Sequence, residues 1–154
     1  MAYDIGPLDG GGETGARRLL ALANYLESIP SAAYDHRVWR RRRPDGSWAM
    51  CALGHAVSGL PDLIGLRWRE PSSDVVVRAD GSGLMEDALT LAGEAFQLSE
   101  DEARMIFGVG LYTVDFYGAA AVFRAGPKQV AAAIRAFALA RLALIHPLGL
   151  ISAA

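Results

Sequence analysis

The chain has 154 residues, of which 52% are hydrophobic and 21% are charged. This is the size of one domain, and at this length about 70% of the surface of the unfolded chain can be buried. The formal net charge of −2 excludes a general electrostatic attraction to nucleic acid or to an anionic membrane, so any such binding has to be local. The single cysteine excludes an internal disulfide. Because no charged segment followed by an apolar one opens the chain, we expect a cytoplasmic protein.

The first thirteen residues are rich in glycine and are interpreted as a flexible arm, followed by a single helical domain over residues 14–154. The glycines of residues 10–15 do not form a phosphate-binding loop, because the Gly-Lys-Ser/Thr ending is missing and no buried strand precedes them. Apolar residues then recur at helical spacing from Leu19 to Leu26. This pattern predicts a first helix over residues 15–28, before Pro30.

A second helix is expected over residues 48–60. Ser47 can cap its first turn, and Pro61 can end it. Most of its side chains are small, and Gly54 and Gly59 lower its helix propensity. We therefore expect a central, buried helix that neighbouring elements approach closely.

The next segments predict a β element and then further helices. Three consecutive valines at 75–77 stand between turn-forming residues and predict a strand paired with residues 66–68. Helical spacing resumes over 84–96, and Ser99 with Glu102 forms a capping box for a helix that reaches Phe107. A helix is expected over 114–124, and Pro127 is favourable as the first residue of the last helix.

The last predicted helix, residues 127–145, is apolar on most faces but contains Arg135 and Arg141. A membrane span needs about 20 predominantly apolar residues, and an arginine at its centre costs about 2.5–3.5 kcal/mol. We therefore expect a core helix or a homodimer interface and no contact with a membrane. The fold class predicted is mainly α, with a single domain of five or six helices and a minor two-stranded β element.

Cys51 and His55 stand four residues apart and form the first candidate site. On one helix their Cβ atoms would lie about 5–6 Å apart. A thiolate in the first turn of a helix beside an imidazolium is an activated nucleophile, so the pair is the catalytic candidate of a thiol-dependent enzyme of acyl-transfer or hydrolase type. The small apolar flanks favour the other interpretation, which is a buried structural thiol and a histidine bonded to a carbonyl.

A metal site would need ligands in addition to Cys51 and His55. The side chains that could supply them are His36, His146, Asp35 and Asp62. No second close-spaced pair of ligands accompanies them, and zinc sites are usually built from such pairs. We therefore expect neither a metal nor another cofactor.

Five arginines and a tryptophan within residues 37–43 form the second candidate site. Guanidinium groups bind phosphates or carboxylates, and an indole can stack on a base. Pro44-Asp45-Gly46 signals a turn, so the segment can also be an exposed strand or loop whose arginines are solvated or paired with carboxylates. Because the whole chain is slightly acidic, another anionic partner, such as an acidic patch of a protein, is preferred to nucleic acid. The candidate binding residues are Arg37, Trp39, Arg40, Arg41, Arg42, Arg43 and Trp48.

Four segments resemble landmarks of a group of small uncharacterised bacterial proteins. They are Cys-Ala-Leu-Gly-His-Ala at 51–56, residues 95–103, residues 106–107 and residues 129–135. The resemblance covers about residues 15–140 and implies no activity. The glycine-rich arm and the arginine-rich segment depart from the pattern of the group.

For the function we prefer a non-enzymatic binding or protein-interaction module of unknown ligand. One alternative is the thiol-dependent enzyme that uses Cys51 with His55. The other is a protein that binds nucleic acid or another anionic partner through residues 37–43. An enzyme needs an accessible thiol of low pKa, whereas a binding module does not.

Overall fold

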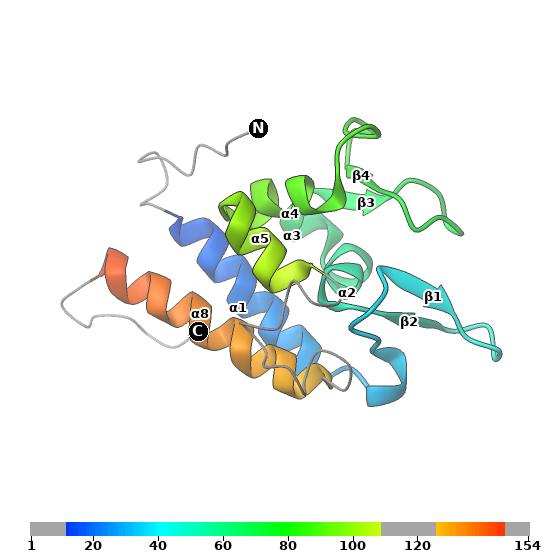
Figure 1. Ribbon diagram of the computed structural model, residues 1–154, viewed down its shortest axis with the longest axis horizontal. Coiled ribbons are helices and arrows are strands. Elements are labelled where there is room, and N and C mark those ends of the chain that lie inside the picture. The colour runs from blue at the N-terminus through cyan, green and yellow to red at the C-terminus, as the bar shows by residue number, and fades with distance from the viewer. Residues whose placement is uncertain (1–11, 109–125, 147–154) are drawn as a thin grey trace.

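The structure is a computed structural model that describes residues 12–108 and 126–146 (Figure 1). The helix expected over 114–124 and nearly all of the glycine-rich arm lie outside these ranges. Within them the chain is mainly α, as expected, with six α-helices and two two-stranded sheets in place of the one predicted β element. The elements are α1 (Glu13–Glu27), the 3-10 helix η2 (Ser31–Ala33), β1 (Arg40–Arg42), β2 (Trp48–Met50), α2 (Ala52–Gly59), α3 (Pro61–Ile64), β3 (Leu66–Trp68), β4 (Val76–Arg78), α4 (Ala88–Phe96), α5 (Glu100–Phe107) and α8 (Pro127–Ile145).

Helices α1 and α8 lie side by side and run antiparallel (Figure 1). Arg135 of α8 donates to Glu27 at the end of α1 over 2.6 Å, whereas His146, just after α8, lies 2.8 Å from Glu13 at the start of α1. Glu13 was expected to belong to the arm but is the first helical residue. No helix in the described ranges is long and apolar enough to cross a membrane. Helix α8 buries one face in the core, and dimerisation through it stays a prediction.

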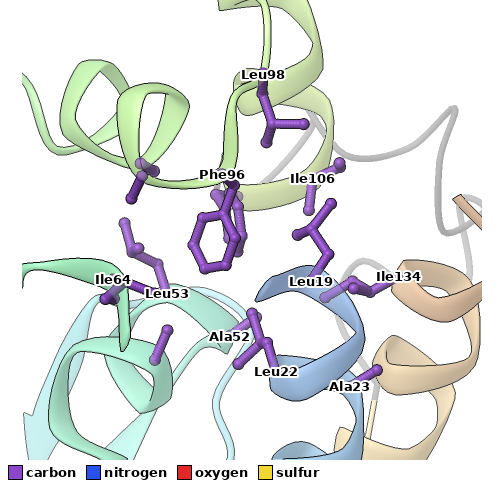
Figure 2. Close-up of a cluster of buried hydrophobic side chains, with 14 of the residues drawn as sticks. Leu19, Leu22, Ala23, Ala52, Leu53, Ile64, Phe96, Leu98, Ile106 and Ile134 are labelled. Atoms are coloured by element: carbon purple, nitrogen blue, oxygen red, sulfur yellow. The ribbon is translucent and has the colours of Figure 1, made fainter. Parts of the chain in front are cut away.

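Helix α4 packs against both α1 and α5, and α5 also meets α8, because Arg141 of α8 binds Glu102 of α5 (Figure 1). The predicted capping box is confirmed: Glu102 donates its N–H to the Ser99 side chain, and Ser99 donates its N–H to the Glu102 carboxylate. Helix α4 begins at Ala88 and not at residue 84, because Asp87 accepts the N–H of Leu89 and caps it. In Figure 2, Phe96 occupies the centre of the buried cluster to which both helices contribute.

The prediction of a helix over residues 48–60 is wrong at its start. Residues 48–50 form β2, which pairs with β1, and the helix begins only at Ala52. Gly46 has a φ of +87°, which closes a tight turn in which Gly46 donates to the Arg43 carbonyl and Arg43 donates to the Ser47 carbonyl. Asp45 accepts both the N–H and the hydroxyl of Ser47, so this serine completes a hairpin instead of capping a helix. The predicted end is confirmed: α2 ends at Gly59, and Pro61 opens the separate short helix α3 after the non-helical Leu60.

The second hairpin joins β3 and β4 and confirms the predicted pairing, with β4 shifted by one residue from the valine run. Leu66 lies opposite Arg78, and Trp68 lies opposite Val76. Leu66 and Val76 are buried and belong to the same core cluster as α1 and α4. The hairpin therefore packs one face on the helices, as the alternation of its side chains requires.

The glycines of α2 allow neighbouring segments to approach the helix closely, as the sequence predicted. A Cβ at Gly54 would lie 2.0 Å from the backbone carbonyl oxygen of Trp39. A Cβ at Gly59 would lie 2.3 Å from the ring of Tyr25. Because no side chain fits at Gly54, the segment that leads into β1 rests directly on the backbone of α2.

Candidate functional site

The only cysteine precedes α2 and is buried. Cys51 is the N-cap residue and not a member of the first turn, and its side chain is only 3% exposed. Its sulfur lies 4.0 Å from the Trp39 carbonyl oxygen, and its N–H donates to the Val38 carbonyl. Burial, which disfavours the charged thiolate, raises the pKa of Cys51 to about 11. At neutral pH the group is therefore a protonated thiol.

His55 is equally buried, and one of its ring nitrogens is hydrogen-bonded to a backbone carbonyl. Its Nε2 lies 2.8 Å from the Ala33 carbonyl oxygen, and because a carbonyl only accepts, Nε2 carries the proton. The imidazole is parallel to the Tyr34 ring at 6.0 Å and meets the Tyr25 ring at its edge. Burial lowers the pKa of His55, so it is neutral at pH 7.

The two residues of the catalytic candidate are linked through the backbone: the His55 N–H donates to the Cys51 carbonyl over 3.0 Å. Across residues 12–108 and 126–146, no hydrogen bond joins the thiol to the imidazole. A buried thiol of raised pKa and a neutral, carbonyl-bound histidine are typical of structural groups.

The residues considered as metal ligands do not converge. Asp35 pairs with arginines, the Nδ1 of His36 lies 2.9 Å from the Tyr34 hydroxyl, and His146 lies beside Glu13. Asp62 is exposed on α3. In the part of the chain that the structure describes, no group of three or more His, Cys, Asp and Glu residues could hold a metal ion.

The second candidate forms a hairpin, named here the arginine hairpin, that comprises residues 37–50 and projects from the helices beside β3–β4 (Figure 1). Arg40 is its anchor. Its guanidinium carbon lies 4.3 Å from the centroid of the Trp48 ring and 4.2 Å from that of Trp68. It also donates to the backbone carbonyls of residues 70, 71 and 73. Arg40 thus joins the arginine hairpin to the β3–β4 hairpin, and its guanidinium is not available to a ligand.

The tryptophans of the candidate site are also engaged. The ring of Trp48 contacts the guanidinium of Arg40 and, at 4.6 Å, that of Arg42. Trp39 is partly buried against the core. Neither indole is therefore presented as an open platform on which a nucleic-acid base could stack.

Three guanidinium groups of the arginine hairpin are exposed. Arg37 and Arg41 both contact the buried carboxylate of Asp35, at 3.1 and 3.2 Å, while their own side chains remain 59% and 52% exposed. Burial would raise the pKa of Asp35, but the hydrogen bonds from the two arginines hold it below its ordinary value. Arg42 is exposed and, within the described ranges, forms no salt bridge. Arg43 instead bonds to Ser47.

The arginine hairpin carries a surplus of positive charge. Residues 35–50 contain five arginines and two aspartates, so their formal charge is +5 − 2 = +3 in a chain of net charge −2. The sequence interpretation missed the contribution of Trp68. Its only local signal was a tryptophan in the one predicted β element, and nothing in the sequence indicates which cation it contacts.

The chain matches no known protein-family model, no curated protein and no solved structure. The resemblance to a group of bacterial proteins therefore stays a prediction.

Proposed function

We propose that this protein is a non-enzymatic binding module that engages an acidic partner protein through the arginine hairpin. The observation that carries the proposal is the exposure of Arg37, Arg41 and Arg42 on a hairpin that, together with Asp35, has a formal charge of +3 in an acidic chain. Concentrated charge of one sign attracts a partner of the opposite sign and fixes its orientation. The hairpin is held in place by Arg40 and by the contact at Gly54, so the charges are presented on a rigid support.

Binding to nucleic acid is the less favoured form of this proposal. Proteins that bind single strands combine basic side chains with open aromatic rings on which bases stack. Here the Trp48 ring already contacts two guanidinium groups, and Trp39 packs against the core. A carboxylate-bearing partner needs only the guanidinium groups, which bind carboxylates through paired hydrogen bonds.

The alternative of a thiol-dependent enzyme has no support in the surroundings of Cys51. Its sulfur is buried, and its pKa is raised to about 11, whereas a nucleophile needs access and a lowered pKa. Rapid labelling of the native protein by a thiol reagent, with an apparent pKa well below about 8.5, would reinstate this alternative.

The proposal is tested with the double variant Arg41→Glu/Arg42→Glu and a fluorescently labelled poly-L-glutamate as the probe. Anisotropy titrations at low salt should show that the dissociation constant rises by about tenfold or more, because each charge-assisted contact contributes about 1.5–3 kcal/mol. Binding by the unaltered protein should weaken as salt is added.

The matched control is Arg67→Glu/Arg69→Glu. It reverses two exposed charges of the neighbouring hairpin, one in β3 and one in the loop between β3 and β4. It should leave most of the affinity in place. Equal losses in the two double variants, or no binding by the unaltered protein, would contradict the proposal. Tighter binding of a twelve-nucleotide single strand than of poly-L-glutamate would favour the nucleic-acid alternative.

A further inference from the structure

The arginine hairpin has one open edge. Its register places Arg41 opposite Ala49 and Arg42 opposite Trp48. The Arg43 N–H donates to the Ser47 carbonyl, so residue 43 belongs to a hydrogen-bonded pair. Because such pairs alternate along antiparallel strands, Arg41 also bonds to β2, whereas Arg40 and Arg42 direct their backbone N–H and C=O groups away from it.

These outward groups have no backbone partner in the part of the chain that the structure describes. None of its hydrogen bonds uses the backbone of Arg40 or Arg42 on the side away from β2. The other edge of the hairpin is different: Met50 forms a parallel bridge with Tyr34, and its carbonyl accepts the N–H of Asp35. The edge of β1 is therefore the free edge of this small sheet. An unpaired edge is a template for another strand.

We propose that an extended acidic segment of a partner protein adds to the edge of β1 as a third strand. This inference rests on the proposed function and specifies how the partner is held. Main-chain hydrogen bonds to Arg40 and Arg42 would supply part of the affinity, and side-chain charge would select the segment. Arg41 and Arg42 are consecutive and point to opposite faces of the sheet, so the segment that fits has acidic residues at consecutive positions.

The same charges argue against a second copy of this chain as the added strand. Two copies paired through β1 would bring the arginines of one strand opposite those of the other, and like charges directly across a strand pair are destabilising. An acidic residue opposite Arg41 would instead lie about 4.5–5.5 Å away at Cβ, within reach of an ion pair.

The test compares two labelled peptides of sequence Val-Glu-Glu-Glu-Glu-Val, acetylated and amidated, by anisotropy with the full-length protein. One has ordinary amides, and the other has N-methyl groups on its four glutamate amides. Methylation keeps the charge but removes the donors that a strand needs. The unmethylated peptide should bind at least about fivefold more tightly. Equal binding of the two peptides overturns strand addition and leaves the charge-based function standing, whereas failure of both peptides contradicts both proposals.

A pair of variants tests the same edge from the protein side. Arg42→Thr removes the guanidinium with its contacts to Trp48 and Gly46, and Arg42→Pro removes the same group and also the outward N–H, which proline tolerates losing at a strand edge. Retained protection of Cys51 from a thiol reagent shows that the hairpin is still packed. The unmethylated peptide should bind Arg42→Pro several-fold more weakly than Arg42→Thr, while the methylated peptide should not distinguish them. Equal affinity of the unmethylated peptide for the two variants would overturn the inference.

Discussion

Hairpins β1–β2 and β3–β4 are both built from three-residue antiparallel strands. They differ in the groups that bind one arginine of each hairpin, Arg40 in β1 and Arg78 in β4. Arg78 of β4 is bound by the carboxylates of Glu86 and Glu94, the latter at 2.8 Å, and these hydrogen bonds raise its pKa. Arg40 of β1 is bound by two indole rings and three backbone carbonyls, which are all neutral. The cation of the β3–β4 hairpin is thus neutralised by carboxylates from the segment after β4 and from α4. The arginine hairpin instead keeps a net positive charge for a partner.

The largest loss of stability should follow when the arginine hairpin is displaced from α2. In Gly54→Ala the new Cβ would overlap the Trp39 carbonyl oxygen at 2.0 Å, and since both groups are backbone-anchored, the hairpin must shift. We expect a loss of more than about 3 kcal/mol in the free energy of unfolding, measured by denaturant titration. Cys51, which should resist a thiol reagent in the unaltered protein, should be labelled rapidly in the variant.

Gly126→Ala is the matched control for this substitution. A Cβ there meets nothing within 4 Å, and the residue has an ordinary negative φ of −89°. It should change stability by less than about 1 kcal/mol and leave Cys51 protected. If Gly54→Ala were as stable as this control, the packing of the arginine hairpin on α2 would be contradicted.

Smaller losses of stability should follow when Arg40 or Arg78 is replaced. Arg40→Met should cost about 2 kcal/mol, because it loses two cation–π contacts and leaves backbone carbonyls without donors. Arg78→Met should cost less, because its carboxylates are partly exposed and can return to water.

Salt sharpens this difference. Thermal melts at 0.05 and 1 M NaCl should show that the destabilisation by Arg78→Met shrinks at high salt, since salt screens its ion pairs. The destabilisation by Arg40→Met should change less, because the rings and carbonyls that it contacts carry no charge and Asp74 is the charged group that attracts it. The same salt dependence for both variants would remove the electrostatic distinction between the hairpins.

The stability of the protein should also depend weakly on pH, through two buried histidines near the arginine hairpin. Burial lowers the pKa of His36 and of His55 from the ordinary 6.5. The unfolded chain therefore takes up protons first, and stability should decline as the pH falls below about 6.5. Each unit of pKa lowering can remove at most about 1.4 kcal/mol. Melts between pH 7.5 and 5 would measure the decline.

The β3–β4 hairpin should respond in a different range of pH. Hydrogen bonds from Arg78 lower the pKa of Glu86 from 4.5, so the stability that this pair provides is present above pH 4.5 and is lost as the pH falls below it.

The contribution of His55 is tested with His55→Gln, whose side chain can still donate to the Ala33 carbonyl. In this variant the decline in stability between pH 6.5 and 5 should become shallower. An unchanged decline in this variant would assign the effect to other groups.

Sequence reasoning located the elements whose ends are set by local chemistry. Ser99 with Glu102, and Pro127 after Gly126, mark the starts of α5 and α8, and both starts are confirmed. The start of α2 was misplaced because Ser47 suits two roles. It could cap a helix, but the turn at Gly46 and the carboxylate of Asp45 use it to close a hairpin. The turn signal was visible, yet the competing pattern of small residues suggested a helix.

The candidate site was predictable only in part for a related reason. The exposure of Arg41 and Arg42 follows from a charge run beside a turn, and this can be anticipated from the sequence. The engagement of Arg40 depends on Trp68, 28 residues later, and on carbonyls of the loop before β4. The protection of Cys51 depends on a backbone contact with Trp39. Contacts between segments that are distant in the chain leave no local pattern.

The pairing of α1 with α8 has a consequence for how the protein forms during synthesis. Arg135 and Glu27, which join the two helices, are separated by 108 residues. Because such a distant contact can form only late, α1 leaves the ribosome well before the helix that covers one of its faces. Until α8 has left the ribosome, the apolar side of α1 that faces Ile134 stays open to solvent and to other nascent chains (Figure 2). A chain whose translation stops before α8 should therefore be prone to aggregation and be a substrate for chaperones.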